Sequence, residues 1–299
     1  MDSQTELFQQ HRPRLFGLAY RMLGTSADAE DVLHDAWLRW HTQDSNALDD
    51  AEAWLVTVTT RLALDRLRRA KTERAHYPGP WLPEPLTAQS EQPDAQVEQA
   101  ESLTMSFLLL LERLNAQERA AFLLREVFDY SHAEAAAMLG IGEDACRQRV
   151  HRAKTKLREG RPRQSVNANT QRRLLERFAQ ALQQPDMETL RALFAEDALH
   201  VSDGGGVVTA TLHPLHGAER LARLYLQIAL QQRKHGVHHQ LHQLNGAPAL
   251  LSWDGDTLIS ASWIDDDGEH ITAIHALRHP EKLARIAAVT KSTAATSLY

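Results

Sequence analysis

Two groups of closely spaced arginine and lysine residues are the strongest chemical signal in the sequence. The first group lies between positions 61 and 74: Arg61, Arg66, Arg68, Arg69, Lys71 and Arg74. The second lies between positions 147 and 163, with Glu159 as its single acid: Arg147, Arg149, Arg152, Lys154, Lys156, Arg158, Arg161 and Arg163. The chain of 299 residues has a formal net charge of −6, so these are basic surfaces on an acidic protein. Clustered cations bind the phosphate backbone of nucleic acid, and two clusters predict two separate contacts.

The second basic group lies on the last helix of a predicted helix-turn-helix. Ser131 and Glu134 have capping-box spacing at the start of a short helix, and Gly140 is its expected left-handed end. A second helix begins near Asp144, with these residues predicted to face inward: Cys146, Val150, Ala153 and Leu157. The opposite side forms a cationic ridge of the size that enters a major groove. The candidates for base or phosphate contact are Arg147, Gln148, His151 and Arg152, and those for phosphate contact or simple solvation are Arg149, Lys154, Lys156 and Arg158.

Two earlier helices precede this motif. One is predicted from Ala51 to Lys71 and carries the first basic group near its C-terminal end, where cations suit the helix dipole. The other runs from Ala29 to Trp40 with apolar residues at helical spacing. Its other face is acidic, with Asp28, Glu30, Asp31 and Asp35. Such a face is either an ordinary solvated surface or a docking surface for a basic partner.

Residues 76–100 break the helical pattern. Four prolines stand between His76 and Pro85, so a helix cannot continue and an extended linker is expected. Trp81 and Leu82 indicate that part of this linker docks onto protein instead of remaining in solvent.

The C-terminal half has a different texture. Helices are predicted at 171–183, 186–195 and 217–231, and short strands near 198–203, 206–212, 237–244, 249–254, 257–264, 270–278 and 283–290. Helices followed by antiparallel strands indicate an α+β layer fold. Residues 292–299 are expected to be a loose tail.

This half contains ten histidines, a residue type that can bind metals or take part in catalysis. His238 and His239 fall on a predicted strand, where neighbouring side chains alternate faces, so they would not converge on a metal. Trp253 and Trp263, with His200 and Asp203, could line a pocket. Asp203 precedes three glycines, which favours a turn or domain contact over a general base. The sequence therefore predicts neither a metal site, nor a cofactor, nor a catalytic residue.

Composition limits the compartment. The single cysteine, Cys146, excludes an intrachain disulfide and is predicted to be a small core residue. No apolar run approaches the length of a membrane span, and the N-terminus lacks a secretory pattern. A cytoplasmic protein without a membrane partner is expected.

The first half resembles extracytoplasmic-function (ECF) sigma factors of the sigma-70 family. Residues 28–37 are similar to the family's helix that docks on the clamp of RNA polymerase, and Ala53-Trp54-Leu55 opens a helix similar to the one that melts and reads the promoter −10 element. Residues 121–128 and 145–153 resemble the −35-reading domain. The resemblance implies polymerase binding, through the beta and beta-prime subunits, by Asp28, Asp31, Asp35 and Trp37. It favours promoter contact by Arg61, Arg66, Arg68 and Arg69.

The second half resembles SnoaL-like domains, a branch of the cone-shaped fold shared with nuclear transport factor 2 (NTF2). One subgroup of these sigma factors carries this extension, with three motifs that are matched here at residues 81–85, 203–206 and 279–283. The last reads His-Pro-Glu-Lys-Leu where the subgroup has Asn-Pro-Asp-Lys-Leu, and Val207 stands where a lysine is frequent. The resemblance implies regulation by the extension in place of a separate anti-sigma protein, through Trp81, Leu82, Pro83, Asp203, Gly204, Gly205, Gly206, Pro280, Lys282 and Leu283.

The predicted organisation is multidomain: two all-α sigma domains, the second with a helix-turn-helix, followed by an α+β SnoaL/NTF2-like cone domain. Its predicted bounds are 1–75, a linker at 76–100, 101–163 and 168–291. The predicted function is promoter-directed transcription initiation with core RNA polymerase. Two alternatives remain open at this point: a small molecule bound in the cone pocket, or a fused isomerase- or cyclase-type enzyme.

Overall fold

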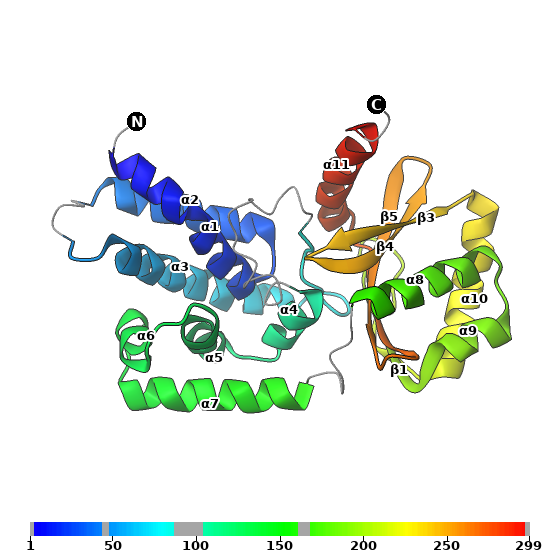
Figure 1. Cartoon of the computed structure of the whole chain (residues 1–299), viewed down its shortest axis with the longest axis horizontal. Helices are drawn as coiled ribbons and strands as arrows, with labels where there is room; N and C mark the ends of the chain where they lie inside the picture. Colours follow the sequence, from blue (N-terminus) through cyan, green and yellow to red (C-terminus); the bar gives the residue numbers. More distant parts are fainter. Residues whose placement is uncertain (1–2, 44–47, 87–103, 161–167, 297–299) are drawn as a thin grey trace. The chain divides into compact units, whose positions relative to one another are not determined.

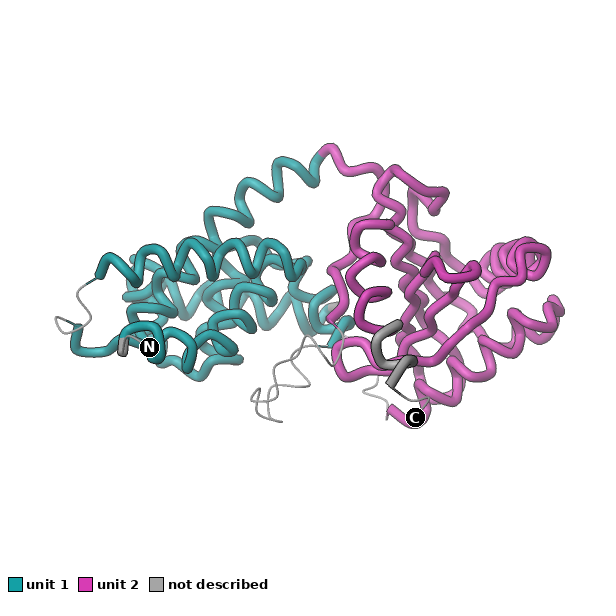
Figure 2. The backbone as a smooth tube through the Cα atoms, turned by 90° about the horizontal axis from the view of Figure 1, so that it is seen from above, with its two compact units in different colours: residues 1–75, 91–161 teal, residues 76–90, 162–299 magenta. Residues whose placement is uncertain are grey.

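The computed structural model describes residues 3–43, 48–86, 104–160 and 168–296. The chain divides into two compact units, shown in Figure 2. Unit 1 comprises residues 1–75 and 91–161, and unit 2 comprises residues 76–90 and 162–299. Linker residues 76–86, which were predicted to be extended, therefore belong to the C-terminal unit, while 87–100 lie outside the described residues.

Unit 1 begins with three helices that pack on one another: α1 (Ser3–Leu23), α2 (Ser26–His41) and α3 (Ala51–Arg74) (Figure 1). Thr25 caps α2 and Asp50 caps α3, each accepting a hydrogen bond from a backbone N–H of the first turn. Trp40 is fully buried, and its indole Nε1 donates to the Gln4 carbonyl at 2.8 Å. The apolar stripe predicted for residues 29–40 is the buried face of α2.

The rest of unit 1 is also helical: α4 (Met105–Glu112), α5 (Ala116–Phe122), the π-helical turn η4 (Leu123–Val127), α6 (His132–Leu139) and α7 (Glu143–Gly160). The helix-turn-helix is formed by α6 and α7. Ser131 and Glu134 make both hydrogen bonds of a capping box, and Gly140 ends α6 at a φ of 65°. Cys146 and Val150 are buried on the inward face of α7, as predicted.

Unit 2 is a mixed sheet with helices. Its elements are α8 (Ala168–Gln183), α9 (Met187–Leu193), β1 (Phe194–Asp203), β2 (Leu215–His216), α10 (Ala218–His235), β3 (His238–Leu244), β4 (Ala247–Asp254), β5 (Thr257–Asp266), β6 (Ile271–Leu277) and α11 (Pro280–Thr296). The strand order is β2-β1-β6-β5-β4-β3, and β1 and β6 are the parallel pair. The predicted α+β architecture is confirmed.

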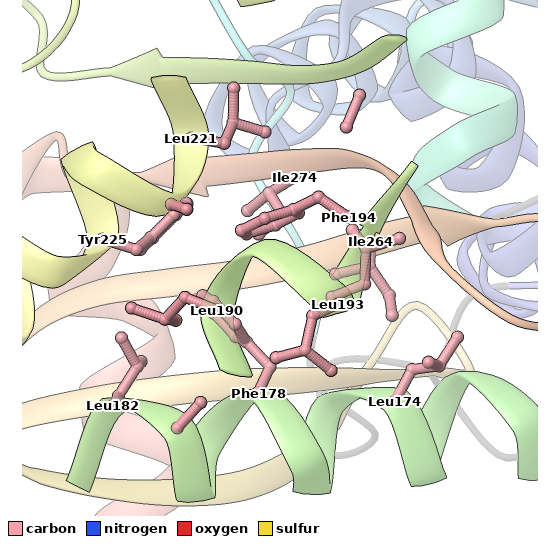
Figure 3. Packing of buried hydrophobic residues seen from close by; sticks show 14 of the residues in the cluster. Leu174, Phe178, Leu182, Leu190, Leu193, Phe194, Leu221, Tyr225, Ile264 and Ile274 are labelled. Atoms are coloured by element: carbon pink, nitrogen blue, oxygen red, sulfur yellow. The ribbon is translucent and has the colours of Figure 1, made fainter. Parts of the chain in front are cut away.

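One face of the sheet packs against α8, α9 and α10. Figure 3 shows the apolar cluster between them, in which Phe178, Phe194 and Tyr225 stack edge to face or in parallel with centroids 4.9–6.2 Å apart. Ile264 and Ile274 enter this cluster from β5 and β6. The space between helices and sheet is therefore filled by hydrophobic side chains.

The other face of the sheet is also covered. Trp263 and His275 pair across β5 and β6 and are 3% and 7% exposed. They alternate with Ile264 and Ile274, so they point away from α8–α10. Asp203 lies on this second face, where it contacts α11 and the segment 76–86. Unit 2 thus has three layers, and the linker segment belongs to the third.

Two predicted strands are wrong. Residues 283–290 belong to helix α11, because Leu283, Ile286 and Thr290 are buried at helical and not alternating spacing. The helix also extends to Thr296, into the predicted tail. Residues 206–212 form an irregular loop: Val207 is 70% exposed, and Ser202 and Thr211 bond to each other in place of a strand ladder. In both segments the β-branched residues suggested a strand that the packing does not support.

Candidate nucleic-acid interface and linker-docking site

Helix α7 presents a polar surface along its outward side. Arg147, Gln148, His151 and Arg152 are exposed. Arg147 forms an ion pair with Glu143 one turn earlier, which holds it against the start of the helix. Exposed arginine, glutamine and histidine side chains carry hydrogen-bonding groups of the kind that contact base edges and phosphates.

Three other cations of α7 are committed to protein contacts, and one of them is Lys156, which lies 2.7 Å from the Glu118 carboxylate. The Arg149 guanidinium donates to the Gln117 side chain at 2.8 Å. Lys154 lies 2.6 Å from the Glu126 carboxylate. From the sequence, these cations were predicted either to contact phosphate or to be solvated. Pairing with another protein side chain was not predicted, because the partners lie some thirty residues away in the chain.

The cations of α3 also divide into two sets. Arg68 and Arg69 are exposed near the end of the helix. Arg66 forms an ion pair with Asp28 at 2.6 Å, and this hydrogen bond raises the pKa of Arg66 further above its ordinary value. Arg61 donates from Nε to the Met138 carbonyl of α6 at 3.2 Å. Unit 1 therefore holds α3 in contact with the helix-turn-helix.

The acidic face of α2 is open at its middle. Asp31 and Asp35 are exposed, and Trp37 is half-buried with its ring 5.0 Å from that of Phe8. Asp28 differs from them, because it accepts from the Thr25 hydroxyl at 2.7 Å in addition to its pair with Arg66. The resemblance placed these four residues, Asp28, Asp31, Asp35 and Trp37, in one docking face. In the structure Asp28 is paired within the unit, and the other three keep exposed surface.

The linker segment is held on unit 2 by one buried carboxylate. Asp203 has no exposed surface. Its Oδ1 accepts from the Tyr77 hydroxyl at 2.5 Å, and its Oδ2 accepts from the Leu82 backbone N–H at 3.0 Å. Lys282 completes the pair from α11, with Nζ 2.7 Å from Oδ2 and 2.6 Å from the Leu82 carbonyl. Release of the linker would remove the two donors Tyr77 and Leu82 from this buried carboxylate and leave it with Lys282 and the Gly205 N–H.

Aromatic rings close over the same cation. Lys282 Nζ lies 4.4 Å from the centroid of the Trp81 ring and 5.8 Å from that of Tyr77. Leu82 and Pro83 are buried beneath, and Leu283 is buried on α11, while Pro280 at the start of α11 is exposed. We call the residues that make these contacts, Tyr77, Trp81, Leu82, Asp203 and Lys282, the linker clasp.

Glycine is required in the loop after Asp203. A Cβ added to Gly206, whose φ is 72°, would lie 2.3 Å from the Pro78 ring of the linker. A Cβ on Gly205 would lie 2.1 Å from the His279 ring, and one on Gly204 would lie 2.5 Å from the Val208 carbonyl. The three glycines therefore let the linker and the residue before α11 approach the β1 end closely.

Several residues of this site were not found from the sequence. Tyr77 lies just outside the recognised linker motif. Glu84 pairs with Arg285 at 3.2 Å, and Asn245 exchanges hydrogen bonds with the backbone of Leu86 at 2.7 and 2.9 Å. Asn245 has a φ of 51° and is followed by Gly246, and this Asn-Gly pair, which favours a tight turn, is the local signal that could have marked it.

The chain matches two family models: Sigma-70 region 2 over residues 7–73, and Sigma-70, region 4 over residues 104–157. It is 35% identical over 254 residues to the ECF RNA polymerase sigma factor SigJ of Mycobacterium tuberculosis, covering 82% of this chain and 78% of that protein. It is 29% identical to the probable ECF sigma factor SigI of the same species, covering 94% and 95%. The crystal structure of M. tuberculosis SigJ superposes with a TM-score of 0.73 and 30% identity, covering 94% and 98% of the two chains.

The chain belongs to the ECF RNA polymerase sigma factors. It therefore binds core RNA polymerase and promoter DNA, and it directs initiation to specific promoters. The likeness to SigJ extends through the α+β half, so the whole chain follows the architecture of that relative.

The residues that could have lined a pocket in the cone domain do not share one face of the sheet. His200 faces α10 and lies 3.0 Å from the Tyr225 hydroxyl, whereas Asp203 and Trp263 lie on the opposite face of the sheet. Burial lowers the pKa of His200 to about 4. The apolar cluster fills the space around it, and the relatives give no support for the ligand-binding or enzyme alternatives. Among the described residues, no group of three or more histidine, cysteine or acidic side chains could hold a metal ion.

No helix in the described ranges of this sigma factor is both long and apolar enough to cross a membrane.

Proposed function

We propose that α3 and α7 are the two promoter-contacting helices of this sigma factor. Arg147, Gln148, His151 and Arg152 would read or grip the −35 element, because they are exposed on the second helix of the helix-turn-helix. Arg149 and Lys154 would add phosphate contacts once their protein partners are released. Arg68 and Arg69 would contact the backbone of the −10 strand. Arg61 and Arg66, like Lys154, would do so only after they leave their protein partners.

The polymerase would be bound through α2. Asp31, Asp35 and Trp37 form an accessible acidic and aromatic face, and Asp28 holds the start of the helix against α3. Opposite charge on the polymerase would raise the rate of encounter more than the affinity.

The arrangement of unit 1 corresponds to a closed state in this proposal. The −10 and −35 elements are about 25 base pairs apart, which at 3.4 Å a pair is roughly 80 Å. Arg61 of α3 and Met138 of α6 are joined by a 3.2 Å hydrogen bond. Two DNA-binding parts in contact do not reach both elements at once, so promoter binding requires their separation.

Unit 2 would regulate this separation through the linker between the two parts. The observation that carries this proposal is the linker clasp, because it fixes residues 77–82 to Asp203 and Lys282. A linker held at this end has less reach than a free one. Regulation is then a population shift between clasped and released linkers, caused by different contacts in the two states.

The test is transcription with purified core polymerase on a promoter library, comparing the full chain with residues 1–166 alone. We expect the shorter chain to bind core polymerase and to give a different transcript yield from the same promoters. Equal yields from both chains would contradict regulation by unit 2. Failure of both chains to bind core polymerase would contradict the assignment of α2.

We further propose that the chain catalyses no reaction itself, since polymerase performs the phosphoryl transfer. It would work in the cytoplasm, where polymerase and promoter meet. Its clasp would take the place of a separate anti-sigma protein, which a pull-down of the tagged chain from its native cells would test.

A further inference from the structure

A basic pocket of about 710 Å³ lies within unit 1, between the end of α3 and the helices α4, α5 and α7. It is lined by two acidic side chains, Glu112 and Glu118, and by eight cationic ones: Arg68, Lys71, Arg74, Arg113, Arg119, Arg149, Arg152 and Lys156. The volume is in the range of small-molecule sites. The excess of positive charge indicates an anionic occupant.

The two acids in the wall are already neutralised. Glu112 bridges Arg74 at 2.9 Å and Arg119 at 2.8 Å. Glu118 pairs with Lys156 at 2.7 Å and accepts from the Asn115 backbone N–H as part of a capping box. Five cations of the lining are left: Arg68, Lys71, Arg113, Arg149 and Arg152. Among the described residues, only Arg68 of these five forms an ion pair with a carboxylate, that of Asp65.

These remaining cations come from three different parts of the unit. Lys71 lies on α3, Arg113 follows α4, and Arg149 and Arg152 lie on α7. Within the part of the chain that the structure describes, none of the four forms an ion pair with a carboxylate, and Arg149 donates to the Gln117 side chain. Charges that converge on a hollow from three elements suit a compact anion with several charges better than the rod-like backbone of a duplex.

Arg119 fixes the inner wall of the pocket. It is 2% exposed, and its guanidinium donates to the Met22 carbonyl and to Glu112. These two bonds hold the wall in place and add a positive charge beside the cavity.

We propose that this pocket binds a compact polyphosphate, either free or as the phosphate chain of a nucleotide. Arg113, Lys71 and Arg152 bind its phosphate oxygens, with Arg119 at the inner wall. The pocket exists only while α3 and α7 belong to one compact unit. The bound anion therefore stabilises that arrangement and occupies Arg152 of the proposed −35 helix. This consequence, unlike the binding itself, rests on the proposed function.

Binding is tested on the full chain by isothermal titration calorimetry at low salt, with sodium tripolyphosphate and with GTP as separate probes. We expect the double variant Lys71→Gln/Arg113→Gln to weaken binding at least tenfold, since both side chains are exposed and neither anchors a helix. The matched control is Arg158→Gln, an exposed cation of α7 outside the pocket, which is expected to change binding less than twofold. Binding is expected to weaken as salt is added.

The outcomes separate the sources and the alternatives. Tighter binding of GTP than of tripolyphosphate, with the same dependence on Lys71 and Arg113, would identify a nucleotide as the source. No heat from either probe would overturn the proposal, as would equal weakening in Arg158→Gln. A short DNA duplex that binds with dependence on Lys71 and Arg113 while both probes fail would assign the pocket to nucleic acid and likewise overturn it.

A transcription assay separates this inference from the proposed function. Tripolyphosphate is expected to lower the transcript yield of the unaltered chain and to leave that of Lys71→Gln/Arg113→Gln unchanged. Calorimetric binding without any effect on the transcript yield would contradict the closed-state part of the proposed function, while the site itself would stand.

Discussion

At the scale of single residues, the account depends on one buried carboxylate. Asp203 is fully buried and accepts from the linker at Tyr77 and Leu82 and from α11 at Lys282. An ion pair of this kind is weak evidence for overall stability, because both charges lose water on burial. Removing one partner is nevertheless costly, since the other is left buried and unpaired. The pair therefore acts as a connection between the linker and unit 2.

Asp203→Asn is expected to release the linker. The amide keeps the size of the side chain but loses the charge that balances Lys282, at a cost of about 2–3 kcal/mol. The backbone N–H of Leu82 donates to Asp203, so in the clasped linker it exchanges slowly with solvent deuterium. Exchange of this N–H should become at least tenfold faster in Asp203→Asn. The control is Asp256→Asn, an exposed carboxylate in the β4–β5 turn, and equal rates in the two variants would refute the clasp.

His200 is expected to make unit 2 sensitive to acid. Its pKa is about 4 in the folded chain because it is buried, against 6.5 for the ordinary side chain. Between these values the unfolded chain binds a proton that the folded chain does not, so the free energy of unfolding falls as the pH falls from 6.5 towards 4. The expected loss from this residue is roughly 3 kcal/mol.

Urea unfolding at a series of pH values measures this loss. In His200→Asn, whose amide can still bond to Tyr225, the dependence on pH between 6.5 and 4 should be clearly smaller than in the unaltered chain. His235→Asn changes an exposed histidine at the end of α10 and should keep the full dependence. An unchanged dependence in His200→Asn would show that other groups cause the acid sensitivity.

At the scale of elements, the helix-turn-helix depends on how α6 ends. Gly140 has a φ of 65°, whereas the nearby Gly142 does not have a positive φ, and a Cβ on either would meet nothing within 4 Å. The two positions therefore differ only in backbone conformation. Gly140→Ala should lower the free energy of unfolding of unit 1 by about 1 kcal/mol, while Gly142→Ala should leave it unchanged or raise it slightly. Chemical denaturation of both variants measures this difference, and equal values would contradict the left-handed cap.

Elements whose signals are local were predictable from the sequence. The capping box at Ser131, the glycine stop at Gly140 and the stripe of α7 all depend on residues a few positions apart, and they predict the helix-turn-helix correctly. The strand predicted at 283–290 was wrong because there the local signal and the tertiary contacts disagree. Ile286, Val289 and Thr290 have strand-forming side chains, but the segment packs on the sheet as a helix, so tertiary contacts override the local preference.

The contacts of the site could be predicted only in part. The motif residues Trp81, Asp203 and Lys282 were expected to act together, and the structure brings them within hydrogen-bonding or ring contact. The commitments of Arg61, Arg66 and Lys154 to protein partners were not predictable. Each partner is separated from its cation by 28–77 residues, and no local spacing reports such pairs.

At the scale of the whole molecule, the central claim is that the two promoter-contacting parts of unit 1 separate when the sigma factor acts. The two parts are joined by the hydrogen bond from Arg61 to Met138, by the ion pair of Arg74 with Glu112 and by the buried bond from Arg119 to Met22, so contacts with polymerase and promoter must offset the loss of all three. The distance between α3 and α7 therefore reports the state of the molecule directly.

A pair of spectroscopic labels measures this distance. Asp65 on α3 and Arg158 on α7 are exposed and can be replaced by cysteine after Cys146→Ala removes the buried thiol. The distance between the labels is compared in the free chain and in the complex with core polymerase and promoter DNA. The account predicts an increase of tens of ångströms in the transcribing complex. The same short distance in a complex that makes transcript would contradict it.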